Sequence, residues 1–259
     1  MGTCYIKQSE MLQVMGRLLL LITFAFIVFS CDDSSSPDQT LIGQSGSMAR
    51  FALTPTHLYS IDDESLNVFQ IMQNGALEKV NALAFGPGVE TIFIRGESLY
   101  IGTNSAMVAY NISNPANPEY VFHYSHFAAC DPVVVQDTLA YITIRTANCK
   151  GSDANTLDIL NIKNPAAPVL IGSYALESPY GLGIDNNLLF VCEGENGLKI
   201  FNAANPFNLV MLKTYRDVNA YDVIPNEGIL IVTGSDGVVQ YNYSDQNNIQ
   251  KLSTISKLK

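Results

Sequence analysis

Positive charge and long apolar segments are both scarce in this chain, and each shortage excludes a class of protein. Lys and Arg number 14 against 24 Asp and Glu, so the 259 residues carry a net charge of −10. A chain this acidic repels nucleic acid and anionic membrane surfaces, and we expect no nucleic-acid partner. The apolar run from Leu18 to Phe29 is shorter than the ~20 residues that a membrane-spanning helix needs.

Motifs for catalysis and metal binding are also missing. The sequence has no His-x-Glu-x-x-His pattern, no Gly-rich phosphate loop and no Gly-x-Ser-x-Gly turn. His123 and His126 would lie on opposite faces of a strand and make a poor metal pair. The sequence therefore favours a non-enzymatic protein without a resident cofactor.

The first 30 residues have the features of an export signal. Arg17 precedes the apolar run closely, and the run ends in the letters VFSC, with Cys31 last. An apolar residue, a small residue and then Cys resembles a bacterial lipobox, which implies that Cys31 carries a lipid and begins the mature chain. We expect a bacterial envelope protein anchored by this lipid alone, at the outer membrane or the cell surface. An ordinary cleaved signal peptide or an uncleaved short anchor would also explain the run.

Residues 31–46 are polar and acidic and contain little to bury, so we expect a tether there. The remaining residues, 47–259, hold an internal repeat. Five segments share one pattern that alternates apolar and other residues and ends in Asn or Gln: LNVFQ from Leu66, MVAYN from Met107, LDILN from Leu157, LKIFN from Leu198 and VVQYN from Val238. Alternation with a period of two predicts strands.

Other apolar segments recur around each copy of this pattern. A nearly continuous apolar run comes before it: HLYSI, SLYIG, TLAYIT, NLLFVC and GILIVT. Such runs are typical of strands buried on both faces. With one further segment on either side, each repeat of about 40 residues holds four strands, as propeller blades do. We therefore predict an all-β fold, a five-bladed β-propeller of four-stranded antiparallel blades over residues 47–88, 89–129, 130–177, 178–218 and 219–259.

A four-stranded sheet that is apolar on both faces must be covered by its neighbours, so we expect the blades to close into a ring. Each repeat supplies all four of its strands, although residues 40–43 could add to the last sheet. The letters NISNPANP, from Asn111, join the third strand to the fourth. Asn caps tight turns and Pro fits poorly inside a central strand, so we interpret this segment as a corner and not a catalytic loop.

Three segments resemble the LVIVD repeat: AMVAYNISNPANP from Ala106, TLDILNIKNPAAP from Thr156 and GLKIFNAANP from Gly197. The resemblance extends over residues 47–259 and implies an exported bacterial propeller, often a lipoprotein, with no established activity. The Asp of the motif is replaced here by Asn111, Asn161, Asn202 and Asn242, and by Gln70 in the first repeat. Asn can make the same local backbone bonds as Asp.

Two cysteines are placed for a disulfide. If the hairpin pairs Val135 with Leu139, Cys130 and Cys149 lie at the same end of it, and the TANCKGSDAN insertion can fold back. We predict a Cys130–Cys149 bond, and two unpaired thiols are the alternative. Cys192, inside an apolar run, is expected to be a small core residue.

One end of the propeller should gather the residues that could bind a ligand. The starts of the innermost strands and the loops between second and third strands share an end, and these positions hold Arg50, Glu90, Asp131, Arg145, Tyr180, Glu193, Tyr221 and Asp222. Our alignment places Asp222 in a column otherwise filled by Phe51, Ile92, Val133 and Leu182. The simpler interpretation is that Asp222 bonds neighbouring backbone. The alternative is that Glu90, Asp131 and Asp222 form a carboxylate site for a cation such as Ca²⁺.

These features favour a non-enzymatic scaffold, monomeric, that presents one propeller face to a protein, peptide or glycan in the envelope. The alternative function is a metal-dependent hydrolase or lactonase with carboxylates in the central channel. A purely structural envelope component is a third hypothesis. Fold alone does not choose among them.

Overall fold

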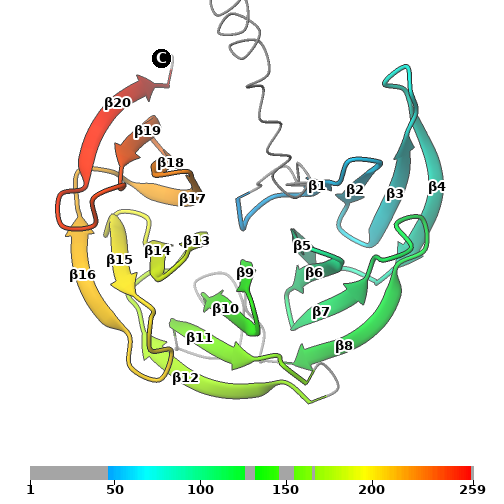
Figure 1. The fold of residues 1–259 in the computed structure, drawn as a ribbon, viewed down its shortest axis with the longest axis horizontal. Coiled ribbons are helices and arrows are strands. Elements are labelled where there is room, and N and C mark those ends of the chain that lie inside the picture. The colour runs from blue at the N-terminus through cyan, green and yellow to red at the C-terminus, as the bar shows by residue number, and fades with distance from the viewer. Residues whose placement is uncertain (1–45, 126–131, 146–154, 165–166, 258–259) are drawn as a thin grey trace, which may run out of the picture. The chain divides into compact units, whose positions relative to one another are not determined.

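The computed structural model describes residues 46–125, 132–145, 155–164 and 167–257. Within these ranges the chain forms five sheets of four antiparallel strands, which are the five blades of a β-propeller (Figure 1). The predicted fold class is confirmed. No helix in the same ranges is long and apolar enough to cross a membrane.

The strands follow one another along the chain and also across each sheet. Blade 1 contains β1 (Phe51–Leu53), β2 (His57–Ile61), β3 (Ser65–Ile71) and β4 (Leu77–Ala84). Blade 2 contains β5 (Val89–Arg95), β6 (Ser98–Thr103), β7 (Ala106–Asn111) and β8 (Glu119–Ser125). Blade 3 contains β9 (Val133–Gln136), β10 (Leu139–Ile144), β11 (Thr156–Asn161) and β12 (Val169–Ala175). Blade 4 contains β13 (Leu182–Asp185), β14 (Leu188–Cys192), β15 (Leu198–Asn202) and β16 (Val210–Tyr215). Blade 5 contains β17 (Ala220–Asn226), β18 (Ile229–Gly234), β19 (Gly237–Asn242) and β20 (Gln250–Ser256).

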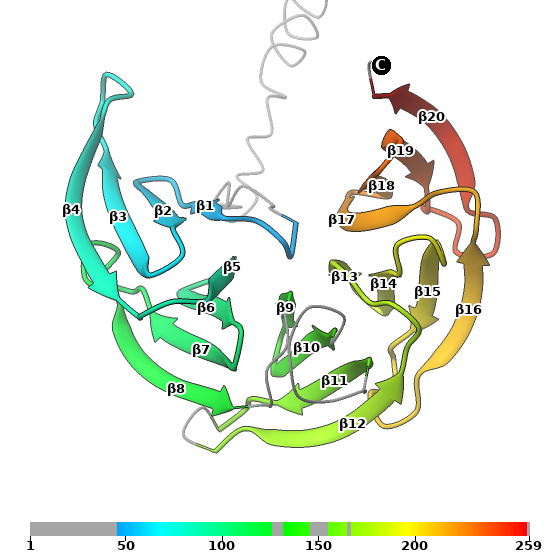
Figure 2. The ribbon, with the colours of Figure 1, turned by 180° about the vertical axis from the view of Figure 1, so that it is seen from behind.

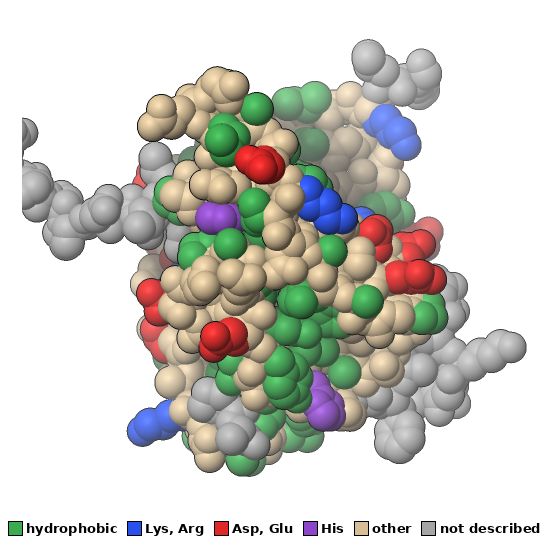
Figure 3. Space-filling model, turned by 90° about the vertical axis from the view of Figure 1, so that its right-hand side faces the viewer, with side chains coloured by type: hydrophobic (Ala, Val, Ile, Leu, Met, Phe, Trp, Pro, Cys, Tyr) green, Lys and Arg blue, Asp and Glu red, His purple; other side chains and the backbone are tan. Residues whose placement is uncertain are grey.

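The first strand of each blade lies near the centre and the fourth lies at the rim (Figure 1). Every fourth strand carries a bulge at the same place, because its pairing with the third strand skips one aliphatic residue: Val80, Val121, Ile171, Leu212 and Leu252. A bulge bends and twists its strand, which suits a strand that curves around the rim. Hydrophobic side chains are exposed among the polar ones on this outer surface, as Figure 3 shows from one side.

The recurrent Asn residues cap the corner between third and fourth strands. The side-chain Oδ1 of Asn111 accepts the Ser113 amide at 2.8 Å, and Asn202 Oδ1 accepts the Ala204 amide at 2.9 Å. Asn161 and Asn242 make the same bond two residues ahead. These bonds fix a turn in which no ladder hydrogen bond is needed, so Pro is tolerated. The expected corner role of the segment is confirmed.

The corners also join neighbouring blades. Tyr59 of blade 1 donates its hydroxyl to the carbonyl of Pro115 in blade 2 at 2.8 Å. Tyr174 of blade 3 donates to the carbonyl of Pro206 in blade 4 at 3.2 Å. Tyr215 of blade 4 donates to the carbonyl of Ile249 in blade 5 at 2.9 Å. Tyr59 is fully buried, so its bond satisfies a phenol that packing has removed from water, whereas Tyr174 and Tyr215 are partly buried.

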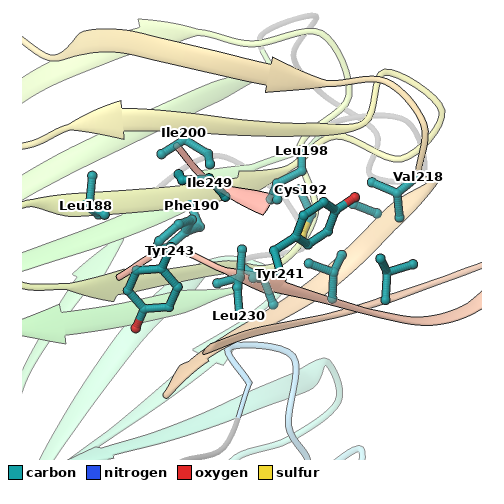
Figure 4. Packing of buried hydrophobic residues seen from close by; sticks show 14 residues of the cluster. Leu188, Phe190, Cys192, Leu198, Ile200, Val218, Leu230, Tyr241, Tyr243 and Ile249 are labelled. Atoms are coloured by element: carbon teal, nitrogen blue, oxygen red, sulfur yellow. The ribbon is translucent and has the colours of Figure 1, made fainter. Parts of the chain in front are cut away.

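The hydrophobic core is divided among the contacts between consecutive blades. Four clusters of buried side chains occur in the described residues, between blades 1 and 2, 2 and 3, 3 and 4, and 4 and 5. In the last of these, Cys192 is a free thiol that packs near Leu198 and Tyr241 (Figure 4). Burial raises the pKa of this thiol well above its usual value, so it behaves as a small apolar side chain, as expected.

The ring is not closed by packing of blade 5 on blade 1, contrary to our expectation. No fifth cluster is found in the described residues, and both views show these two blades apart (Figures 1 and 2). The prediction that the second strand of each blade is buried on both faces is accordingly wrong for blades 1 and 5. The middle residues of β6, β10 and β14 are all buried, whereas buried residues alternate with partly exposed ones in β2 and β18. An end blade has one neighbour and can bury one face only.

Candidate functional site

Tyr180 is held firmly in the loop that leads into β13. Its amide donates to the carbonyl of Cys192 at 2.8 Å, and its carbonyl accepts the hydroxyl of buried Thr143 at 2.6 Å. Its ring lies against Gly194, where an added Cβ would come within 2.7 Å of the ring. Gly194 has a φ of 54°, which favours glycine, and the missing side chain leaves the space that the ring occupies.

Two of the other predicted binding residues stack with this ring. The guanidinium carbon of Arg145 lies 4.0 Å from the centre of the Tyr180 ring. The ring of Tyr221 lies 4.9 Å from that of Tyr180, tilted by 42°. Tyr221 is 36% exposed. We call Arg145, Tyr180 and Tyr221 the tyrosine stack; they come from blades 3, 4 and 5 and are brought together only by the fold.

The main chain around the stack is largely used within the protein. The amide of Gly181 donates to the carbonyl of Tyr221 at 2.8 Å, and Cys192 donates to Gly181 at 2.9 Å. Gly194 and Ala220 exchange two hydrogen bonds, at 2.8 Å and 3.1 Å. A ligand at this place would therefore meet side chains and not a free strand edge.

Asp222 lies beside the stack, and a segment that precedes β1 covers it. We call residues 46–50 the leading segment. The hydroxyl of Ser47 donates to Asp222 Oδ1 at 3.2 Å, and the amides of Ser47, Met48 and Val223 donate to the same carboxylate. An added Cβ on Gly46 or Gly181 would collide with the carboxylate, so both glycines allow this close approach. Burial raises the pKa of Asp222 to about 6, against these hydrogen bonds, which lower it.

The leading segment ties the end blades to the rest of the propeller. Ser47 is fully buried, and its hydroxyl oxygen accepts the amide of Leu182 in blade 4 at 2.7 Å. The carbonyl of Ala49 accepts the amide of Ile92 in blade 2 at 2.9 Å. Asp222 belongs to blade 5, so a few residues connect innermost strands of three blades. The bonding of Asp222 to neighbouring backbone agrees with the simpler of our two interpretations.

The alignment that made Asp222 anomalous is wrong by one residue. Counting back from the hairpins, Val223 pairs with Val232 as Ile92 pairs with Ile101, so Val223 occupies the apolar column. Asp222 instead shares its position with residues of mixed polarity: Arg50, Thr91, Pro132 and Gly181. A polar or charged side chain is therefore not unusual in this column.

Glu193 lies inside the protein and not on a binding surface. Its side chain is fully buried, with Lys199 Nζ 2.7 Å from Oε2 and the amide of Glu177 3.2 Å from Oε1. Lys199 also lies 3.3 Å from Glu177 Oε1. The buried charge is thus compensated, as such charges must be.

The remaining predicted residues divide into two groups. Arg50 is exposed and pairs with Asp63 at 2.9 Å, and Glu90 is partly exposed and has a contact of its own. Asp131, Cys130, Cys149 and Cys31 lie outside the described residues. In the part of the chain that the structure describes, no group of three His, Cys, Asp or Glu side chains is arranged to hold a metal ion.

Sequence reasoning missed the supporting residues of the site. Ser47, Thr143 and Gly194 are a serine in a polar stretch, a strand threonine and one of 18 glycines, and none stands out in the sequence. Lys199 gives no signal either, because its position in the third strands is variable and is occupied in the other repeats by Asn67, Val108, Asp158 and Val239.

A family model described as the LVIVD repeat matches residues 88–126 and 151–175. A sequence comparison with curated proteins gives no significant match. Solved structures match with a TM-score of 0.63 at 14% identity for a functionally unknown protein from Desulfotomaculum acetoxidans, covering 85% of this chain and 75% of that one. A periplasmic gluconolactonase from Pseudomonas aeruginosa matches with a TM-score of 0.59 at 11% identity, over 78% of this chain and 67% of that one.

BamB from Moraxella catarrhalis also matches, with a TM-score of 0.54 at 11% identity, over 78% of this chain and 57% of that one. At these identities the likeness concerns the fold alone. Residues 88–126 and 151–175 therefore match the LVIVD repeat, and the described residues of the chain fold as a five-bladed β-propeller.

Proposed function

We propose that this protein is a non-enzymatic binding scaffold, held in the bacterial cell envelope by a lipid on Cys31, that presents the tyrosine stack to a protein, peptide or glycan. The observation that carries the proposal is the stack itself. Tyr180 is fixed by bonds from its own main chain and by the shape of Gly194, and a cation and a second aromatic ring lie against it. Rigid tyrosines and arginine are the residues that dominate binding surfaces.

The hydrolase alternative draws no comparable support from the site. Asp222, its central residue, already accepts hydrogen bonds from the Ser47 hydroxyl and from backbone amides. A hard cation needs carboxylate oxygens that are free to coordinate it. The likeness to a gluconolactonase structure concerns the fold and names no residue here.

Binding through the stack is tested with the purified full chain and the double variant Tyr180→Ala, Tyr221→Ala. Envelope extract is passed over each immobilised protein, and any captured molecule must be lost with the double variant. Lys251→Ala, at a residue paired with Asp217 and not among the predicted binding residues, is the matched control and should capture as the parent does. Capture that is equal for all three proteins would overturn the proposal.

Anchoring is tested separately in cells. Labelling with a fatty-acid analogue should mark the parent chain and leave Cys31→Ala unlabelled and released from the membrane fraction. Equal membrane retention of Cys31→Ala without label would contradict the lipid anchor but not the binding function.

A further inference from the structure

The geometry of the tyrosine stack points to an acidic ligand. The guanidinium carbon of Arg145 lies 4.0 Å from the centre of the Tyr180 ring. A contact of this kind with an aromatic ring uses the charge of the guanidinium and none of its N–H groups as hydrogen-bond donors, and the planar fork of these groups matches the two oxygens of a carboxylate. No carboxylate among the described residues forms an ion pair with Arg145, whereas Arg50 and Lys251 each pair with one carboxylate and Lys199 pairs with two.

The surroundings favour a sugar over a peptide as the bearer of that carboxylate. A peptide that binds by its main chain needs unpaired backbone groups on the protein. Here the amides of Tyr180, Gly181, Gly194 and Ala220 all donate within the protein. What is left for contact is the partly exposed ring of Tyr221 beside Tyr180, and a rigid aromatic face suits the apolar face of a pyranose ring.

We propose, on the basis of the binding function above, that the tyrosine stack recognises a uronic acid in an acidic glycan. Tyr221 and Tyr180 would contact the sugar ring, and Arg145 would donate two hydrogen bonds to its carboxylate. The chain carries a net charge of −10, so long-range attraction does not draw in a polyanion and the local contact has to supply the selectivity.

Isothermal titration calorimetry with the full chain tests this inference. The probes are trigalacturonate and trimannuronate, each compared with its own methyl ester, which keeps the sugar rings and removes the charge. We expect at least one acid to bind and its ester to bind about tenfold or more weakly, as is typical when a charge-assisted hydrogen bond is lost.

Three variants separate the contact of Arg145 with the carboxylate from the contact of the tyrosine rings with the sugar ring. Arg145→Gln should bind acid and ester alike, at the level of the ester with the parent chain. Tyr221→Ala should weaken acid and ester by a similar factor, because the ring contact is common to both. Lys251→Gln removes a cation that is not among the predicted binding residues and has its own partner in Asp217, and it should leave both affinities unchanged.

The outcomes separate this inference from the function on which it rests. Equal binding of acid and ester by the parent, or no binding of either while the stack still captures a protein or peptide from extract, would overturn the uronic acid and leave the scaffold function standing. Acid-selective binding that survives Arg145→Gln would overturn the assignment to the stack. Loss of every stack-dependent capture would overturn both.

Discussion

The internal blades and the end blades of this propeller contain the same strands but differ in what covers them. Phe51, Ile92, Val133, Leu182 and Val223 occupy one column of the repeat; Phe51 is 57% exposed and Ile92 is fully buried. Leu53 is 38% exposed at the position where Ile94 is 6% exposed. The side chains are equally apolar, so the difference comes from the neighbour and not from the strand.

The face of blade 5 on which no further blade packs differs in composition as well. At the positions where blade 2 places Ala109 and Phe122 against blade 3, blade 5 has Gln240 and Ser253, which bond to each other at 2.9 Å. Polar outer faces are typical of terminal units in repeat proteins. The leading segment also stabilises the end blades. It joins them to blades 2 and 4 through hydrogen bonds instead of face packing.

The largest expected difference between the two kinds of blade concerns ion pairs. Lys199→Met in blade 4 leaves Glu193 buried without a counter-charge, and we expect it to lower the free energy of unfolding by about 4 kcal/mol. Arg50→Met in blade 1 breaks an exposed pair with Asp63 and should cost less than about 1 kcal/mol. Urea unfolding of both variants measures the contrast, and similar losses would mean that the buried pair is screened by solvent.

Phe51 and Ile92, which occupy the same position in blades 1 and 2, test directly how much packing between blades contributes to stability. Ile92→Ala should lower the free energy of unfolding by about 3 kcal/mol, because the side chain is fully buried between blades 1 and 2. Phe51→Ala removes more atoms from a side chain that is mostly in water and should cost less than about 1 kcal/mol. Equal losses in urea unfolding would show that the open face of blade 1 is covered in solution.

The contact of the leading segment with blade 5 should depend on pH. The pKa of Asp222 is about 6 in the folded protein and near 4 in an unfolded chain, so between these values the folded state binds more protons. The contribution of this group to stability is therefore full below about pH 4 and decreases as the pH rises to about 6. The loss is up to about 3 kcal/mol, because each tenfold change in proton affinity corresponds to about 1.4 kcal/mol.

Asp222→Asn isolates this contribution, since other carboxylates also titrate in the range. The difference in unfolding free energy between the parent and Asp222→Asn, measured by urea unfolding at pH 4, 5, 6 and 7, should change in favour of the variant as the pH rises. A constant difference across these values would contradict the assignment of the pH effect to Asp222.

Particular residues show how far the sequence could predict this structure. The alternation in LKIFN and its copies predicted the third strands because period two is a local property that survives in every blade. The burial of the second strands could not be predicted, because ILIVT in β18 and LLFVC in β14 look alike and only their neighbours differ. Arg145, Tyr180 and Tyr221 were placed at one end by strand order, but the stack depends on Gly194 and on loop geometry that no periodicity encodes.

The smallest effect on the free energy of unfolding should come from the corners between third and fourth strands. Tyr59→Phe removes the hydroxyl that donates to the carbonyl of Pro115 and keeps the buried ring, so we expect a loss of about 1 kcal/mol in urea unfolding. Tyr120→Phe is the matched control, because its hydroxyl contacts exposed His123 within the same strand and water can replace it. If Tyr59→Phe costs no more than Tyr120→Phe, the corners orient the fourth strands without stabilising the contact between blades.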